Sequence, residues 1–430
     1  MRILLTFLSI LFLSGTTFAQ GYTVSGGAGT PYSYGDNLTG TNIERVYLLN
    51  GLNGAKVSYS SSAVSVVFYR YRQSLADKEQ IPDSEISISS SNNSTTYTIS
   101  NLADGYGYYA EANGKSEDAV WIIDYKSRQS SLTSIEVVEN EDKCENLKLF
   151  VTKTDGELFF YPKNQSGIKR DIPVRYTLSY EDAKWDDGKK EFVPESHGRS
   201  MIIGTEIIID APLKDTKFVL RGDQFAEYFN IAKQVSVDYQ AAAVKGYITS
   251  ENENGSNEAN AENSAPFTVD FYSHANDAVR YYTWFIYNRK DMDNYIVRYA
   301  DKDIKYTFDQ SGDFVIKLEV ANAASDCVDT TSVSLNIADW KLEAPNYFSP
   351  GGSTGTEFKV SYKSILKFKC TIFNRWGVKI YEWNDPTKGW DGRYNGSYVN
   401  TGVYYYVIEY TSSDGKRRKK SGDINVLQRK

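Results

Sequence analysis

Two histidines, three cysteines and 55 acidic residues are the side chains of this 430-residue chain that could do acid–base or metal chemistry. His197, in PESHGRS, and His274, in FYSHAND, stand in no nucleophile elbow, HExxH pair or Cys/His metal spacing. A hydrolase needs a nucleophile with a base and an orienting group, and a glycosidase needs a pair of carboxylates. No such set stands out. We therefore expect a protein that is not an enzyme and that has no cofactor and no metal site.

Two features of the sequence could bind a ligand, and each also has an ordinary structural role. The turn YEDAKWDDGKK, 180–190, is acidic, but it lacks the ligand register of a calcium loop and is typical of a solvated Asp/Gly turn. The 34 tyrosines could stack on bases or sugars, although at a period of two they are typical of sandwich cores. The first 340 residues carry a net charge of −15, which opposes a phosphate backbone. We expect no nucleic-acid partner.

The first nineteen residues, MRILLTFLSILFLSGTTFA, have a basic start, an apolar centre and a small residue at the end. This pattern predicts a secretory signal peptide at 1–19. No later run is apolar for 18 residues, so we expect no membrane-spanning helix.

Secretion leads to an oxidising compartment, which permits a disulfide among Cys144, Cys327 and Cys370. Cys144 with Cys327 is one candidate pair, but spacing alone does not select it. Cys370 lies in the alternating run KFKCTIF, and we expect it to be a buried apolar residue.

Apolar residues alternate with polar ones in VSVVFYRYR (64–72), SEISIS (84–89) and GVYYYVIEY (402–410), between clusters of Gly, Asn, Asp and Ser. The pattern predicts half-buried strands joined by turns, with at most one short helix at 224–232. We expect an all-β fold of tandem immunoglobulin-like or fibronectin-like β-sandwiches, four modules after the signal peptide. The segment 250–266 has no aliphatic residue larger than Ala and is interpreted as a linker. The predicted modules are 20–139, 140–250, 262–338 and 341–430, with the linker at 251–261.

Two of the modules carry recognisable patterns. In NLADGYGYYAEA, the spacing of Leu102, Gly105 and Tyr108 resembles fibronectin type III sandwiches, which implies a tyrosine hydroxyl bonded to upstream backbone. The third module, from APFTVDFYS to SVSLNI, resembles the PKD domain, an immunoglobulin-like sandwich of bacterial surface proteins. That resemblance implies that Trp284 fills the core and that Phe308 and Gly312 lead into the next strand. The second module shows strands without a signature.

The end of the chain contains PNYFSPG (345–351), IFNRWG (372–377), GWDG (389–392), GVYYY (402–406) and a closing SGDINVLQR. In order and spacing these motifs resemble the gliding motility-associated C-terminal domain of Bacteroidota, also called the type B sorting domain of the type IX secretion system. The resemblance implies export through the type IX translocon and an outer-membrane partner similar to PorP/SprF. Its motif residues are Pro345, Asn346, Phe348, Ser349, Pro350, Asn374, Arg375, Trp376, Gly377, Trp390, Asp391, Gly392, Gly402 and Tyr404.

These residue types also have ordinary structural roles. Gly377 permits a turn, Asp391 can cap backbone donors, and Arg375 is expected to lie over Trp390 or to pair with Asp391. Trp376 either fills the core or, if it is exposed, is a candidate for recognition. The alternative is that all of these side chains only stabilise a small sandwich.

Residues 341–430 contain 16 Lys plus Arg and 8 Asp plus Glu. This excess of positive charge favours a surface that binds acidic protein or anionic lipid headgroups. The alternative is a chance difference in net charge between domains. The basic patch is predicted at Lys416, Arg417, Arg418, Lys419 and Lys420. A second interpretation is that these residues protect an exposed sheet edge from aggregation.

The sequence as a whole predicts a secreted protein at the cell surface or outer membrane that docks to the PorP/SprF-like partner. The alternative is a compact adhesin whose first two modules bind a glycan or protein ligand.

Overall fold

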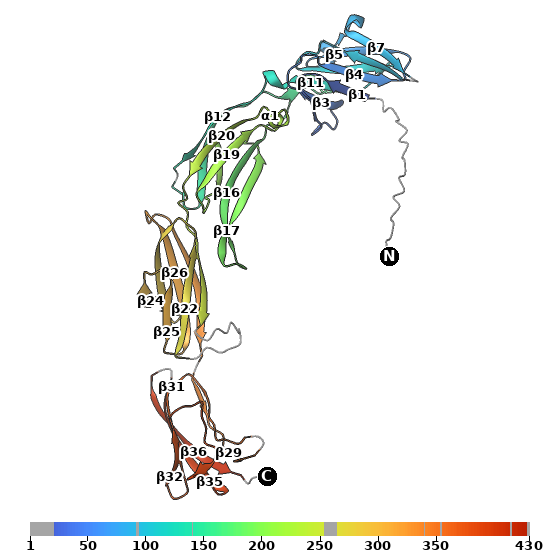
Figure 1. Cartoon of the computed structure of the whole chain (residues 1–430). Helices are drawn as coiled ribbons and strands as arrows, with labels where there is room; N and C mark the ends of the chain where they lie inside the picture. The colour runs from blue at the N-terminus through green and yellow to red at the C-terminus, as the bar shows by residue number, and fades with distance from the viewer. Residues whose placement is uncertain are drawn as a thin grey trace, which may run out of the picture.

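The computed structural model of the chain describes residues 21–91, 94–139, 141–252, 265–338, 340–352, 355–412 and 415–427. Four β-sandwich modules follow one another as a curved string from the N-terminal to the C-terminal end (Figure 1). The all-β fold of tandem sandwiches is therefore confirmed. The predicted signal peptide, 1–19, lies outside the described residues.

Module one is a sandwich of two sheets, with strand orders β1-β4-β8-β7 and β2-β3-β11-β9-β5-β6, and with β10 paired to β9. Tyr108 is buried, and its hydroxyl accepts a hydrogen bond of 2.8 Å from the Ala103 backbone N–H, as the fibronectin-like pattern predicts. The strands are β1 (Gly21–Ser25), β2 (Tyr32–Tyr34), β3 (Ile43–Leu49), β4 (Lys56–Ser61), β5 (Val66–Tyr71), β6 (Glu79–Gln80), β7 (Ile86–Ser91), β8 (Ser94–Ile99), β9 (Tyr106–Ala112), β10 (Lys115–Ser116) and β11 (Ala119–Asp124).

Module two packs the sheet β12-β13-β18 against the sheet β17-β16-β19-β20. It also carries a small hairpin, β14-β15, and the five-residue helix α1 (Gln224–Tyr228), which fits the single short helix expected there. The strands are β12 (Ser131–Val138), β13 (Asn146–Thr154), β14 (Phe159–Phe160), β15 (Arg170–Asp171), β16 (Tyr176–Asp186), β17 (Glu191–Met201), β18 (Glu206–Asp210), β19 (Thr216–Gly222) and β20 (Lys233–Tyr239).

The boundary predicted between residues 139 and 140 falls inside module two. Strand β12 pairs antiparallel with β13, so the polar stretch after Val138 connects two strands of one sheet. A turn within a domain and a linker between domains have the same polar composition, and only the strand register distinguishes one from the other. The boundary is corrected to the residues just before Ser131.

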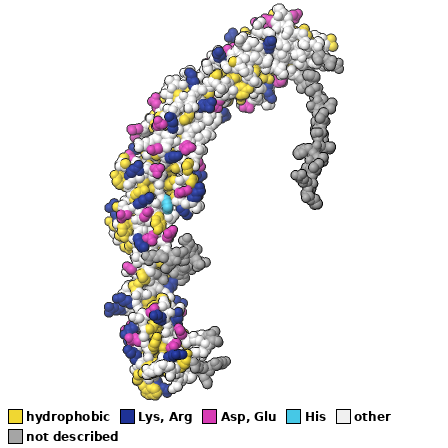
Figure 2. Space-filling model, in the orientation of Figure 1, with side chains coloured by type: hydrophobic (Ala, Val, Ile, Leu, Met, Phe, Trp, Pro, Cys, Tyr) yellow, Lys and Arg dark blue, Asp and Glu magenta, His cyan; other side chains and the backbone are white. Residues whose placement is uncertain are grey.

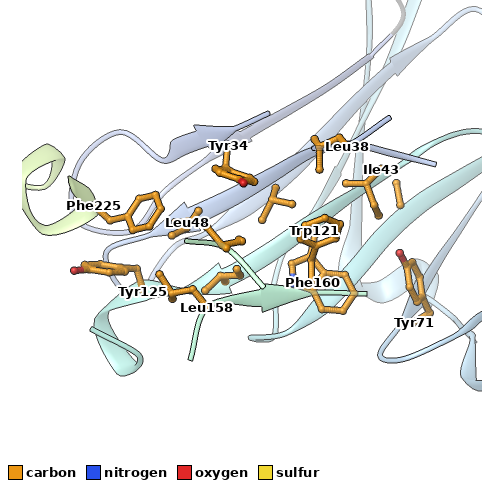
Figure 3. Close-up of a cluster of buried hydrophobic side chains, with 14 of the residues drawn as sticks. Tyr34, Leu38, Ile43, Leu48, Tyr71, Trp121, Tyr125, Leu158, Phe160 and Phe225 are labelled. Atoms are coloured by element: carbon orange, nitrogen blue, oxygen red, sulfur yellow. The ribbon is translucent and has the colours of Figure 1, made fainter. Parts of the chain in front are cut away.

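Modules one and two share a continuous core at their junction. Leu158, Phe160 and Phe225, from module two, pack beside Trp121 and Tyr125 of module one (Figure 3). The Tyr125 hydroxyl also donates a 2.9 Å hydrogen bond to the buried carboxylate of Asp223. Burial of apolar area across the junction favours a stiff connection between these two modules.

Module three has the sheets β21-β22-β25 and β24-β23-β26-β27. Trp284 is fully buried between them and its indole N–H donates to the Asp301 carbonyl, at 3.1 Å. Phe308 ends β25 and Gly312 begins β26, as expected. The strands are β21 (Gly246–Asn252), β22 (Phe267–Ala275), β23 (Val279–Asn288), β24 (Asp291–Tyr299), β25 (Ile304–Phe308), β26 (Gly312–Asn322) and β27 (Val328–Ile337).

The predicted linker, 251–261, does not separate modules two and three. Strand β21 pairs antiparallel with β22 from Gly246 opposite Ala275 to Asn252 opposite Val269. The segment between them, 253–264, lies outside the described residues, and it joins neighbouring strands of one sheet. Residues 246–250, assigned to module two from the sequence, belong to module three.

A disulfide joins modules two and three. Cys144, in the loop between β12 and β13, is bonded to Cys327, which precedes β27. Trp185, near the tip of the β16–β17 hairpin, stacks on Tyr247 of β21 with ring centroids 4.4 Å apart. The Asn276 side-chain amide donates to the Leu213 carbonyl at 2.7 Å. The candidate cysteine pair is thus the bonded one, and Cys370 is a buried free thiol, as expected.

Module four contains the five-stranded sheet β29-β36-β35-β31-β32 and two short pairs, β28-β30 and β33-β34. Its core is separate from that of module three. The strands are β28 (Lys341–Glu343), β29 (Tyr347–Phe348), β30 (Ser361–Lys363), β31 (Ile365–Phe373), β32 (Lys379–Trp383), β33 (Arg393–Tyr394), β34 (Ser397–Tyr398), β35 (Gly402–Ser412) and β36 (Arg417–Val426). The described part of the chain holds no helix with the length and apolar character needed to cross a bilayer.

Candidate functional site

The first terminal motif, PNYFSPG, closes one edge of the main sheet of module four. Strand β29 runs parallel to the end of β36, and the Asn346 carbonyl accepts a 2.9 Å hydrogen bond from the Asn425 backbone N–H. Phe348 and Pro350 are buried, whereas Pro345 and Ser349 are half-buried and Asn346 is exposed. The Ser349 backbone N–H donates to the Gly355 carbonyl at 2.9 Å. This motif therefore supplies core side chains as well as a tight backbone turn.

The second motif forms the exposed turn of the β31–β32 hairpin. The Asn374 side-chain oxygen accepts hydrogen bonds from the backbone N–H groups of Trp376 and Val378, each at 3.0 Å. Gly377 has a φ of 78°, which permits the turn. The Trp376 ring is 77% exposed, and the Arg375 guanidinium lies 5.2 Å from its centroid. Trp376 is therefore a surface residue and a candidate for recognition.

The third motif turns around a buried tryptophan. Trp390 is fully buried and its indole N–H donates to the Arg393 carbonyl at 2.9 Å. The Asp391 carboxylate accepts from the Arg393 backbone N–H at 3.1 Å, which is the capping role expected of it. The predicted contact of Arg375 with Trp390 or Asp391 is wrong, because Arg375 lies over Trp376 and Asp391 pairs with the Arg393 side chain at 3.5 Å.

The buried motif residues meet in one aromatic cluster. The Trp390 ring centroid lies 5.4 Å from that of Phe348 and 5.6 Å from that of Tyr404. The Tyr404 hydroxyl donates to the Asn400 carbonyl at 3.0 Å, and burial raises the pKa of this phenol. Gly402 begins β35 beside Arg375. Three sequence motifs, far apart in the chain, thus build the same core.

The basic run does not form one patch. Side chains of β36 alternate between the two faces of the sheet, so Arg417 and Lys419 are exposed on the outer face. Arg418 lies over the Trp340 ring at 4.7 Å, and the Lys420 ammonium donates to the Leu342 carbonyl at 2.8 Å. Lys416 is exposed in the turn before the strand. Within the described residues β29 pairs only with Asn425 and Val426, so the rest of β36 is an edge of the main sheet. Protection of this edge by basic side chains is therefore also consistent with the structure.

The sequence did not predict that two lysines of another strand lie on the same face as Arg417 and Lys419. Lys367 and Lys369, on β31, share the outer face with Arg417 and Lys419, across the central strand β35. Together they line a shallow groove of about 510 Å³ that also contains Glu409 and Thr411. The two pairs of cations are 50 residues apart in the chain, and only the strand register brings them together.

The residues considered for catalysis lie in strands. His197 stacks on Tyr180, with ring centroids 4.6 Å apart, and His274 is 2.8 Å from the Thr249 hydroxyl. Among the residues described, no group of three or more His, Cys, Asp or Glu side chains could hold a metal ion. In the acidic turn, the Asp186 carboxylate accepts from the backbone N–H groups of Gly188 and Lys189, at 2.9 and 3.0 Å. It caps its own turn.

The fold and the motif cluster define the class: a multi-domain β-sandwich protein with a terminal module that has its own core. Residues 342–426 match the family model described as the CHU_C type IX secretion signal domain. Residues 136–237 match the model of a fibronectin type III domain, in the module that showed no signature by sequence reasoning. The terminal domain indicates export by the type IX secretion machinery to the cell surface or the extracellular space.

No curated protein matches the sequence. Among solved structures, a tetra-tandem repeat in the extending region of a large adhesion protein is 11% identical, covers 89% of this chain and 98% of its own, and has a TM-score of 0.22. A Ca²⁺-stabilised adhesin of an Antarctic bacterium that binds ice is 11% identical, with 90% and 96% covered and a TM-score of 0.21. Dimeric latent PorU from Porphyromonas gingivalis is 11% identical, with 77% and 36% covered and a TM-score of 0.17. These scores are too low to carry an inference about binding.

Proposed function

We propose that the protein is a non-enzymatic accessory or interaction protein held at the outer membrane. Its terminal module is a type B sorting domain that addresses the chain to the type IX translocon and then docks to a PorP/SprF-like outer-membrane protein. The three preceding modules hold a binding surface away from that anchor, with the third acting as a PKD-like spacer.

One observation carries this proposal. Three of the terminal motifs converge on a single core around Trp390, and this core is separate from the neighbouring one. A module that folds independently can be recognised as a unit, whatever precedes it. The match over residues 342–426 covers nearly the whole of this module. The stiff junctions formed by the shared core and the disulfide support the spacer role of the preceding modules.

Export is tested by removing residues 423–430, which include the end of β36. Ile424 and Val426 belong to the terminal core, so the truncation should prevent this sandwich from closing and leave the protein in the periplasm. Fusion of residues 341–430 to a periplasmic reporter should carry the reporter to the surface, whereas the reporter alone should stay behind. Normal surface display of the truncated protein would refute the sorting role.

Docking is tested by cross-linking the full-length protein on intact cells and identifying the outer-membrane proteins attached to it. We expect a PorP/SprF-like protein, and we expect Trp376→Ala to reduce its recovery because that ring is exposed at a hairpin tip. Recovery of no outer-membrane protein would count against the accessory role while leaving the export signal intact.

A glycan-binding adhesin is the second candidate, and one feature of module one favours it. Hydroxyl groups cover the outer face of the sheet β1-β4-β8-β7, with Ser58 and Thr98 at 3.0 Å and Ser60 and Thr96 at 2.9 Å across neighbouring strands. Such a surface offers many donors and acceptors for sugar hydroxyls. A glycan array probed with the full-length protein distinguishes the two candidates, since an accessory protein should give no selective signal.

A further inference from the structure

The outer face of the terminal sheet carries an ordered group of cations, which we call the basic groove: Lys367, Lys369, Arg417 and Lys419. Lys367 lies opposite Thr411 of β35, and Thr411 lies opposite Arg417 of β36. In the next row Lys369 lies opposite Glu409, which lies opposite Lys419. The cations thus stand at the four corners of a rectangle, with Thr411 and Glu409 in the middle.

Sheet geometry fixes the size of this rectangle. Neighbouring strands are about 4.8 Å apart and residues i and i+2 about 6.7 Å apart, so the corners are about 10 Å by 7 Å apart. The side chains of Lys367 and Arg417 are long enough to reach a common anion above Thr411, away from the Glu409 carboxylate in the next row. The rectangle therefore fits one or two phosphate-sized groups.

The charges of the groove remain largely available. In the part of the chain that the structure describes, Lys367, Arg417 and Lys419 form no ion pair, and all three are exposed. Lys369 pairs with Glu382 at 3.3 Å, and its side chain is 51% exposed. Glu409 is the single acidic residue among those that line the groove. Lys and Arg side chains project from the flank of this module (Figure 2).

We infer that the basic groove binds the phosphate groups of an anionic lipid surface. Three of the four corners are lysines, which bind phosphate groups as compact point charges and do not depend on the bidentate geometry of arginine. The groove is shallow and lies on an open sheet face, so it can approach a flat surface of headgroups. This inference adds a membrane contact to the proposed docking of the terminal module. It concerns the middle of the sheet and not the β31–β32 turn that carries Trp376.

The test is co-sedimentation of the purified full-length protein with vesicles of phosphatidylethanolamine, with and without phosphatidylglycerol. The unaltered protein should bind only the vesicles that contain phosphatidylglycerol, and binding should weaken as salt is added. In Lys367→Gln/Lys419→Gln, the loss of two surface lysines should lower the affinity roughly thirtyfold. Excess inorganic phosphate or pyrophosphate should compete only weakly, because a free ion engages few of the cations at once.

A matched control is Lys359→Gln/Lys388→Gln, which removes the same charge from two exposed lysines of module four outside the groove. This variant should bind almost as well as the unaltered protein. An equal loss of vesicle affinity in both variants would mean that binding depends on net charge and not on the groove, and would overturn the inference. Absence of binding to phosphatidylglycerol vesicles at low salt would also overturn it. So would complete competition by free phosphate. Vesicle binding is measured with purified protein and does not depend on export. A protein that binds no vesicles would therefore not contradict the export proposal, and a protein that is not exported in cells would not contradict the vesicle result.

Discussion

Gly392 and Pro350 are in such close contact that a Cβ on the glycine would lie 2.6 Å from the proline Cγ. Gly392 also has a φ of 84°. The contact joins the turn after Trp390 to the turn after Phe348, and it explains why two distant motifs both contain small or rigid residues. The two turns can meet only if residue 392 has no side chain, because the Pro350 ring fills the space beside it.

Gly392→Ala should therefore destabilise module four by about 3 kcal/mol, because both the left-handed backbone and the steric clash oppose the new methyl group. Gly396→Ala is the matched control: its φ is 85°, but a Cβ there would meet open space. We expect this control to cost only about 1 kcal/mol. Calorimetry of the full chain measures both, and equal losses would show that the contact with Pro350 is unimportant.

The two tryptophans of the terminal motifs should respond differently to truncation. Trp390→Ala removes a buried ring and should cost about 3–5 kcal/mol, whereas Trp376→Ala removes an exposed ring and should leave the unfolding temperature nearly unchanged. Thermal unfolding of both variants gives the comparison. A large loss of stability in Trp376→Ala would contradict the exposed position of that ring and its proposed role in recognition.

The Cys144–Cys327 disulfide should hold modules two and three in a fixed relation. Cys144→Ala/Cys327→Ala should lower the free energy of unfolding by about 2–5 kcal/mol and should increase the spread of particle dimensions in small-angle scattering. Cys370→Ala is a control for the loss of a cysteine away from the junction. An unchanged scattering profile would mean that the ring contacts around Trp185 and Tyr247 hold the junction without the disulfide.

The stability of module four should fall at alkaline pH. Burial raises the pKa of the Cys370 thiol to about 12, from an ordinary value of 9.0. Since the folded state keeps the thiol protonated while the unfolded chain ionises, this contribution is complete below about pH 9 and is lost at about 1.4 kcal/mol per pH unit above it. Urea unfolding between pH 9 and pH 12 should show that the free energy of unfolding declines less steeply with pH in Cys370→Ala than in the unaltered protein. Identical slopes would contradict the prediction.

Local patterns predicted much of the fold. Alternation marked the strands, and two single residues were placed correctly: Tyr108 bonds to upstream backbone and Trp284 fills a core. In the terminal module, Gly377 and Asp391 have the turn roles expected from their residue types. These predictions depend on a few neighbouring residues, whose conformational preferences act over short distances.

Features that depend on pairing between distant strands were not predicted. The polar stretch between β21 and β22 has the composition of a linker, and only the register shows that it joins two strands of one sheet. The shared core of modules one and two likewise needs Phe160 and Phe225 to reach Trp121 across the junction. For the same reason the basic run looked continuous in sequence, whereas Lys367, a member of the groove, lies on another strand.

The position of the disulfide has a mechanical consequence. Cys144 and Cys327 enclose almost the whole of modules two and three within one covalent loop. If the two ends of the chain are pulled apart, tension passes from Cys144 to Cys327 through the sulfur–sulfur bond. Residues 145–326 then carry little of the load, so the middle of the string can stay folded while its ends are stretched.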